Sequence, residues 1–93
     1  MAEYSVGDAL KRLIAQSGWG DRVNEYRIKE DWEKIVGITI ARYTHNVQLR
    51  NKVLIVSTDV APLKQEIILG KDNLIAKINL HFAETMVLDI KVR

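Results

Sequence analysis

The sequence contains no cysteine, and this absence removes several kinds of chemistry. Without thiols the chain forms no disulfide, has no thiolate nucleophile and builds no zinc–thiolate site. The two histidines, His45 and His81, lie far apart in the sequence, and no tight carboxylate cluster accompanies either one. We therefore expect no metal site. A chain without cysteine also fits the reducing cytoplasm, which is the location we predict.

Long hydrophobic runs are missing as well. The longest aliphatic run is VLIV at residues 53–56, far short of the roughly 20 apolar residues that span a bilayer. The first residues, MAEYSVGDALKR, do not place a basic segment before an apolar one as a signal peptide does. We expect the protein neither to enter nor to span a membrane.

An excess of one charge and the common catalytic motifs are also lacking. The 14 Lys and Arg against 12 Asp and Glu leave a formal charge of +2, so any basic function must be local. No Walker loop, G-x-S-x-G or dinucleotide fingerprint occurs, and the adjacent Glu30 and Asp31 suit the positive end of a helix dipole better than acid–base catalysis. We predict that the protein is not an enzyme and holds no cofactor.

The chain is long enough for one modest hydrophobic core. Its 93 residues are 47% hydrophobic and contain no linker or repeat, which predicts a single domain over residues 1–93 without a flexible extension. Residues 5–18 are predicted to form the first helix, because Val6, Leu10 and Leu13 recur at helical spacing. Ser5 suits the start of this helix and Gly18 its end.

A second helix is predicted over about residues 30–43, after a short turn near Asp21. Trp32 and Gly37 both lie within it, in the stretch EDWEKIVGITIARYT. Trp32 is predicted to be buried, and Gly37 to let another element approach closely where a side chain is missing. The apolar residues on one face of this helix are Ile28, Trp32, Ile35, Val36, Ile40 and Tyr43.

Residues 45–58, HNVQLRNKVLIVST, are typical of a β-hairpin. Asn51 and Lys52 form the predicted two-residue turn, since asparagine tolerates the left-handed conformation that a tight hairpin requires. This turn sets Leu49 opposite Leu54 and Val47 opposite Val56 on the buried face. The other face carries Gln48, Arg50, Val53 and Ile55.

A long helix and a final strand complete the predicted order. The helix begins after the cap residue Asp59 and places on one face Val60, Leu63, Ile67, Leu74, Ile78 and Phe82. In VLDIKVR, at residues 87–93, Leu88, Ile90 and Val92 are predicted to be buried, and they alternate with Asp89, Lys91 and Arg93. The order is helix, helix, strand, strand, helix, strand, which indicates the α+β class.

This order and several of its segments resemble the DciA family of bacterial replicative-helicase loaders, formerly a domain of unknown function. The segments that carry the resemblance are DWEKIVG running on to IARYT, the hairpin VQLRNKVLIVST, LKQEI near the start of the long helix, and the final VLDIKVR. The resemblance implies a KH-like core, in which helices pack on one face of a small three-stranded sheet. It also implies two partners, DNA and the replicative helicase, and hence association with the nucleoid.

Cationic residues around the hairpin are the candidates for nucleic-acid contact. Lys and Arg side chains neutralise phosphates, and Tyr43 offers a ring on which a base can stack. The alternative is a solvated hairpin edge, because lysines commonly protect such edges. G-x-x-G does not occur, so we do not expect sequence-specific RNA binding of the KH kind. The candidate residues are Arg42, Tyr43, His45, Arg50, Lys52 and Lys64.

A second candidate surface is the apolar strip formed by Leu69, Ala76 and Leu80, on the side of the long helix opposite its core face. Such a strip suits a protein partner or a weak homodimer, although scattered apolar residues are also ordinary on protein surfaces. Two functions remain open. One is a DNA-binding accessory of the replicative helicase, for single-stranded or forked DNA without sequence preference. The other is a small protein-interaction module that binds no nucleic acid.

Overall fold

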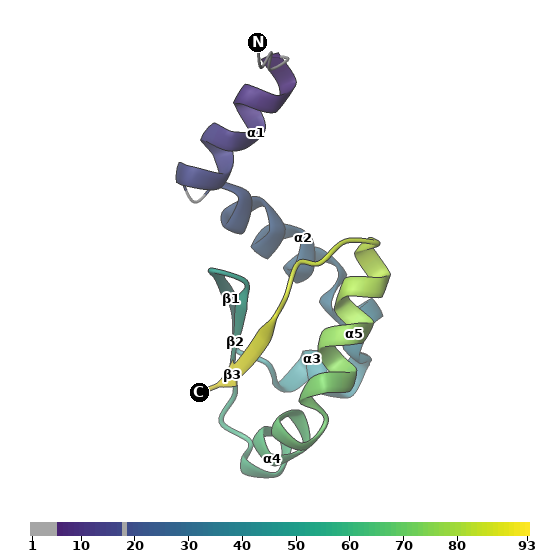
Figure 1. Ribbon diagram of the computed structural model, residues 1–93. Coiled ribbons are helices and arrows are strands. Elements are labelled where there is room, and N and C mark those ends of the chain that lie inside the picture. The colour runs from purple at the N-terminus through teal and green to yellow at the C-terminus, as the bar shows by residue number, and fades with distance from the viewer. Residues whose placement is uncertain (1–5, 18) are drawn as a thin grey trace.

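A computed structural model describes residues 6–17 and 19–93 of the chain (Figure 1). The α+β class and the predicted order of elements are confirmed, although each of the two longer helices is divided in two. The caps predicted at Ser5 and Gly18 lie outside the described residues. The elements are α1 Val6–Ser17, α2 Trp19–Val36, α3 Ile38–Tyr43, β1 Asn46–Arg50, β2 Val53–Ser57, α4 Ala61–Leu69, α5 Lys71–Phe82 and β3 Asp89–Val92.

The three strands form one mixed sheet in the order β1-β2-β3. β1 and β2 are the predicted antiparallel hairpin, and the pairs Leu49–Leu54 and Val47–Val56 are in the expected register. β3 is parallel to β2, so the chain between them must cross over, which it does through α4 and α5. The pairing of β3 with β2 therefore joins residues that are far apart in the sequence.

Helices cover one face of this sheet and leave the other open. Alternate residues of β1 and β2 are buried, and Ile90 of β3 is buried beside Leu54, its partner on β2. Trp32 is 5% exposed, which confirms its predicted place in the core, and its Nε1 donates a hydrogen bond to Thr44 Oγ1 at 3.1 Å. The core consists of Ile28, Trp32, Ile35, Val47, Leu49, Leu54, Val56, Leu63, Ile67, Ile78, Met86, Val87 and Ile90.

The second helix differs from its prediction at both ends. No turn occurs at Asp21, because α2 is helical from Trp19 onward, and the helix stops at Val36. Gly37 has φ 93°, a conformation that residues with a side chain rarely adopt, and α3 starts after it. No atom lies within 4 Å of a Cβ built on Gly37, so the expectation of a close approach there was wrong. Glycine instead permits the break. Tyr43, at the end of α3, is exposed rather than part of the core.

The long helix is divided at Gly70, where α4 ends and α5 begins. Gly70 has φ −96°, which any residue can adopt, and its N–H donates to Glu66 O at 2.9 Å while its own carbonyl accepts from Leu74 N. The break is a change of helix direction rather than a strained position. Leu63, Ile67 and Ile78 still reach the core, so the predicted apolar face continues across the break.

The outer edge of β1 is covered by α2. The Leu49 N–H donates to Glu25 Oε1 and the Asn51 N–H donates to Asp21 Oδ2, both at 2.9 Å. Asp21 and Glu25 are four residues apart and so lie on the same side of α2, while the two amides are two residues apart along the strand. The two carboxylates take the place of carbonyl acceptors from a fourth strand.

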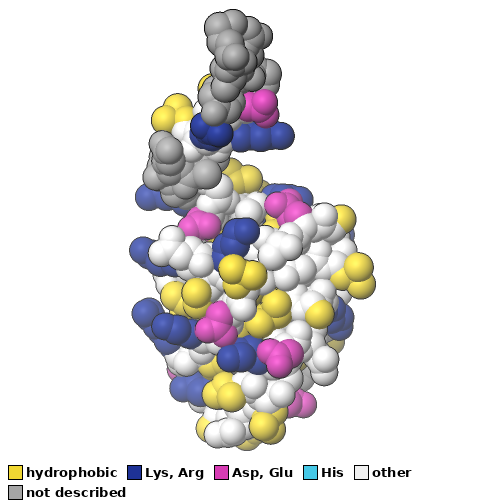
Figure 2. All heavy atoms as spheres, viewed as in Figure 1, with side chains coloured by type: hydrophobic (Ala, Val, Ile, Leu, Met, Phe, Trp, Pro, Cys, Tyr) yellow, Lys and Arg dark blue, Asp and Glu magenta, His cyan; other side chains and the backbone are white. Residues whose placement is uncertain are grey.

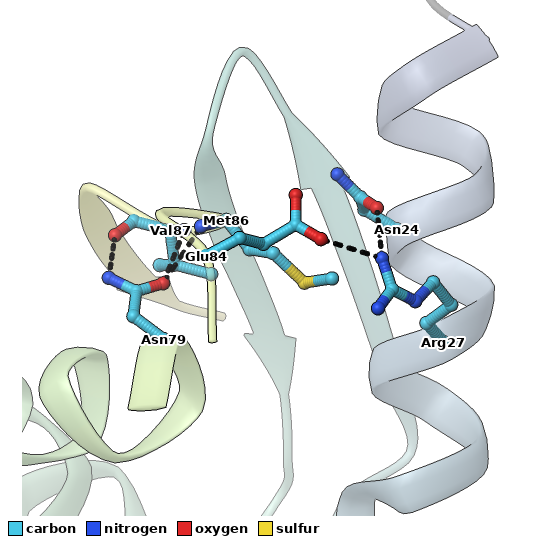
Figure 3. A network of polar contacts seen from close by, with 6 residues as sticks. All are labelled: Asn24, Arg27, Asn79, Glu84, Met86 and Val87. Carbon is cyan, nitrogen blue, oxygen red and sulfur yellow. Dashed lines mark hydrogen bonds and ion pairs between the residues drawn. The ribbon is translucent and has the colours of Figure 1, made fainter. Parts of the chain in front are cut away.

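The segment before β3 is held by polar contacts (Figure 3). Asn79 Oδ1 accepts hydrogen bonds from the N–H groups of Met86 and Val87, and Asn79 Nδ2 donates to Val87 O, each at 2.9 Å. Arg27 of α2 pairs with Glu84 at 2.8 Å. These contacts bury Met86 and Val87 and direct the chain into β3. Leu88 is 64% exposed, contrary to its prediction, because it precedes the strand.

Candidate nucleic-acid interface

The turn of the hairpin presents two of the predicted cations, Arg50 and Lys52. Asn51 and Lys52 have φ values of 50° and 63°, as the two central positions of a type I′ turn require. The Asn51 N–H is held by Asp21, and the Lys52 carbonyl accepts a hydrogen bond from Leu88 N at 2.8 Å. Contacts from α2 and from the segment before β3 thus fix the turn, and the side chains of Arg50 and Lys52 are exposed there.

The other predicted residues lie at the opposite end of β1. Arg42 and Tyr43 are exposed at the end of α3, and the Tyr43 carbonyl accepts a hydrogen bond from Thr58 Oγ1 at 2.7 Å. His45 precedes β1, and its Nε2 is 2.6 Å from Asp59 Oδ2. Lys64 is half-buried in α4, which begins shortly after β2 ends.

The six predicted residues therefore form two groups rather than one compact patch. β1 has five residues, so its ends are about 15 Å apart at roughly 3.3 Å per residue. Arg50 and Lys52 lie at one end, and the group that contains His45 lies at the other. The contact with Asp59 also places a carboxylate beside His45. Nucleic-acid contact by these residues stays a prediction.

The open face of the sheet connects the two ends and carries further cations. Lys91 is paired with Ile55 across β2 and β3, and Gln48 is paired with the same Ile55 across β1 and β2. Arg93 continues the ladder, since its N–H donates to Val56 O and its carbonyl accepts from Thr58 N. The rows across this face are Arg50–Val53–Asp89, Gln48–Ile55–Lys91 and Asn46–Ser57–Arg93.

Lys91 and Arg93 were absent from the candidates predicted from sequence. The alternation of the last strand places both on its outward face, but it does not reveal that β3 lies beside β2. Both side chains are exposed. Figure 2 shows Lys and Arg side chains along the left side of the molecule, where Figure 1 places the strands.

One carboxylate opposes these cations on the open face. Asp89 Oδ1 is 3.1 Å from Lys71 Nζ and also accepts a hydrogen bond from Ile90 N at 2.8 Å. The pKa of the Asp89 carboxyl lies below its usual value, and the largest cause is the hydrogen bond from Lys71. The hydrogen bond from Ile90 N is the second cause. Asp89 is therefore ionised at neutral pH, and Lys71 offsets its charge.

The predicted partner residues are all exposed but do not lie on one helix. Leu69 is the last residue of α4 and is 83% exposed, whereas Ala76 and Leu80 lie on α5 and Leu80 is 82% exposed. The break at Gly70 separates them without burying them. Their role in binding a partner stays a prediction.

Two other features bear on the kind of site the chain can hold. Among residues 6–17 and 19–93, no three His, Asp or Glu side chains are grouped so that they could hold a metal ion. Within the same described ranges, no helix combines the length and the apolar character needed to cross a bilayer.

The chain folds as a small α+β domain with a mixed three-stranded sheet, and comparison with known proteins identifies its family. The sequence model of the family described as "Dna[CI] antecedent, DciA" matches residues 5–92. The chain belongs to the DciA family. This confirms the family that the sequence resembled.

A bacterial relative supports the same conclusion. A "UPF0232 protein" from Corynebacterium glutamicum (strain R) is 31% identical over 55 residues, which cover 59% of this chain. The matched part is 31% of the relative's own length, so this chain corresponds to less than a third of that protein. No solved structure matches the chain.

Proposed function

We propose that the protein binds DNA without sequence preference and assists the bacterial replicative helicase, without catalysing a reaction itself. Membership of the DciA family supports this function, since the family is associated with helicase loading. The proposed location is the cytoplasm, in association with the nucleoid. The proposed DNA is single-stranded or forked.

The observation that carries the proposal is the set of exposed cations on the hairpin turn and the open face, namely Arg50, Lys52, Lys91 and Arg93. They lie on one side of the sheet or at its end, and all four are exposed among the residues that the structure describes. Lys and Arg bind DNA by neutralising phosphates and releasing condensed counterions. The paired rows of this face contain no aromatic residue, which favours contacts to the backbone over base stacking.

The second group extends the proposed surface beyond the open face. Arg42 and Lys64 add cations near the end of the sheet where Arg93 lies, and Tyr43 offers the ring on which a base can stack. His45 contributes less in this proposal because Asp59 lies beside it. The helicase would meet a different surface, that of Leu69, Ala76 and Leu80.

The test compares two double variants with the same change in net charge. Arg50→Glu with Lys52→Glu removes two proposed contacts, whereas the control, Lys34→Glu with Lys77→Glu, changes exposed lysines on α2 and α5. Affinity for a short labelled single strand is measured by fluorescence anisotropy over a salt series. Six phosphate contacts, by Arg42, Arg50, Lys52, Lys64, Lys91 and Arg93, predict a slope of log affinity against log salt of about −4, and the four that remain in the hairpin variant predict a slope of about −3.

The parent and the control should share the steeper slope, and the hairpin variant should bind more weakly for every sequence tested. Equal affinity and slope in the parent and the hairpin variant would remove the hairpin from the DNA surface. A strong base preference would also contradict the proposal, because phosphate contacts carry no sequence information. Absence of binding at low salt would favour the alternative, a protein-interaction module.

A further inference from the structure

The outer edge of β1, which faces α2, carries a row of outward amides. The N–H groups of Leu49 and Asn51 belong to this row, and each donates to a carboxylate of α2. The amides of an antiparallel strand alternate in direction, so the Val47 N–H, two residues before Leu49, points to the same side. Among residues 6–17 and 19–93, no group accepts a hydrogen bond from this N–H, although Val47 is only 4% exposed. A buried donor without a partner is costly, which marks the third amide of the row as a place for an acceptor.

Lys29 occupies the position on α2 that follows the two acids facing this edge. Asp21 and Glu25 are four residues apart, and Lys29 comes next at the same spacing. Four residues of a helix advance about 6 Å along its axis, and two residues of a strand advance about 6.6 Å, so the two rows stay in step. Lys29 and Val47 accordingly line the same pocket. Lys29 Nζ is 3.5 Å from Glu25 Oε2, which is longer than the roughly 2.7 to 2.9 Å of a strong charge-assisted hydrogen bond.

The pocket lies between α2 and the start of β1 and has a volume of about 210 Å³. Its other lining residues are Trp32, Thr44, His45 and Asn46. Trp32 Nε1 donates to Thr44 Oγ1, which in turn donates to a backbone carbonyl. His45 Nε2 lies 2.6 Å from Asp59 Oδ2. The polar groups that remain are the ammonium of α2 and the backbone N–H of β1, both of which are donors, and the exposed Asn46 amide, which can also donate. A cation beside free donors suits an anion.

We propose that this pocket binds a phosphate group, whose oxygens accept hydrogen bonds from the Val47 N–H and from Lys29 Nζ. The pocket volume is several times the roughly 30 Å³ that a water molecule takes in the liquid, which leaves room for such a group. The inference rests on the proposed function, because the phosphate that we assign to the pocket is one of the DNA backbone. Arg42 and Tyr43 lie at the same end of β1, so the pocket adds a phosphate contact to that group. Lys29 was not among the candidates predicted from sequence.

Nuclear magnetic resonance of the ¹⁵N-labelled protein tests the pocket, with inorganic phosphate as the probe at constant pH and ionic strength. The Val47 amide proton should shift and reach saturation, whereas the Leu49 amide, which already has Glu25 as its acceptor, should shift much less. Lys29→Gln should weaken phosphate binding about tenfold by removing a charge-assisted hydrogen bond. The control Lys34→Gln, which changes another exposed lysine of α2, should leave it unchanged. The spectra also show that each variant is folded. Equal shifts at Val47 and Leu49 in the parent, or parental binding by Lys29→Gln, would overturn the proposal.

A second titration, with a short oligothymidylate, identifies the source of the phosphate. The Val47 amide should shift on binding of the oligonucleotide, and the shift should be lost in Lys29→Gln. If inorganic phosphate moves this amide and the bound oligonucleotide does not, the pocket takes free phosphate and its assignment to DNA is wrong. An oligonucleotide that binds nowhere on the protein would overturn the proposed function together with this assignment. An unmoved Val47 amide in both titrations, with the oligonucleotide bound at the hairpin, would refute the pocket alone.

Discussion

The change Asn79→Ala tests how β3 is held in place. The Asn79 side chain makes three hydrogen bonds to the backbone of Met86 and Val87, two residues that are 1% and 0% exposed. No sequence pattern drew attention to this asparagine. Its removal leaves two N–H groups and one carbonyl without their partners.

The magnitude follows from these three bonds. A hydrogen bond contributes a net value of about 1 kcal/mol, and a buried group left without a partner costs about 1 to 3 kcal/mol. Alanine recovers about 0.5 kcal/mol through its higher helix propensity. We therefore expect Asn79→Ala to lower the free energy of unfolding by about 2 to 4 kcal/mol, a large part of the total for a small domain.

Urea unfolding followed by tryptophan fluorescence measures this change, because Trp32 is buried in the core. Asn73→Ala is the matched control, since Asn73 lies on the same helix with an exposed side chain. The control should change stability by less than about 0.5 kcal/mol. If the two variants unfold at the same urea concentration with equal slopes, the three bonds do not stabilise the fold and the reasoning fails.

Four further substitutions give distinct outcomes. Gly37→Ala should cost about 1 to 3 kcal/mol because φ is 93° there. Gly70→Ala should cost less than Gly37→Ala, because the φ of Gly70 is ordinary and the new Cβ would only have to adjust to the Glu66 carbonyl oxygen at 3.3 Å; equal thermal shifts would contradict this. Trp32→Ala should cost about 3 to 5 kcal/mol by leaving a cavity, and an unchanged melting temperature would place Trp32 outside the core. The hydrogen bond from His81 holds the pKa of the Asp31 carboxyl below its ordinary value of 3.8, so its stabilisation is complete above that pH and is lost as the pH falls through the lower folded-state value. As the pH falls below 3.8, the free energy of unfolding measured in urea should therefore decrease less in the Asp31→Asn variant than in the parent. Equal decreases in the two proteins would refute the linkage.

The hairpin could be predicted from the sequence because all of its determinants are local. Asn51 tolerates the left-handed conformation, and the two-residue turn fixes which residues face each other. The alternation of apolar and polar residues then assigns Val47 and Leu49 to the core. Arg50 and Lys52 follow at the turn without any knowledge of the rest of the fold.

The helix breaks and part of the candidate site could not be predicted in this way. A glycine within an apolar stripe is compatible with a continuous helix or with a break, and at Gly37 and Gly70 the stripe continues on both sides. Lys91 and Arg93 depend on which strand β3 joins, and its partner β2 is distant in the sequence. Only the packed structure decides these points, because the sequence near each residue permits more than one outcome.

The parallel pairing of β2 with β3 has a consequence for the time course of folding. The hairpin closes through neighbouring residues, and such structures form within about 1 to 10 microseconds. β3 joins the sheet by pairing Val53 with Asp89, and such non-local pairing is slow because loop closure must come first. We expect a chain that has formed the hairpin alone to display Arg50 and Lys52, while the neighbouring cations of the last strand take their places only when the sheet is complete.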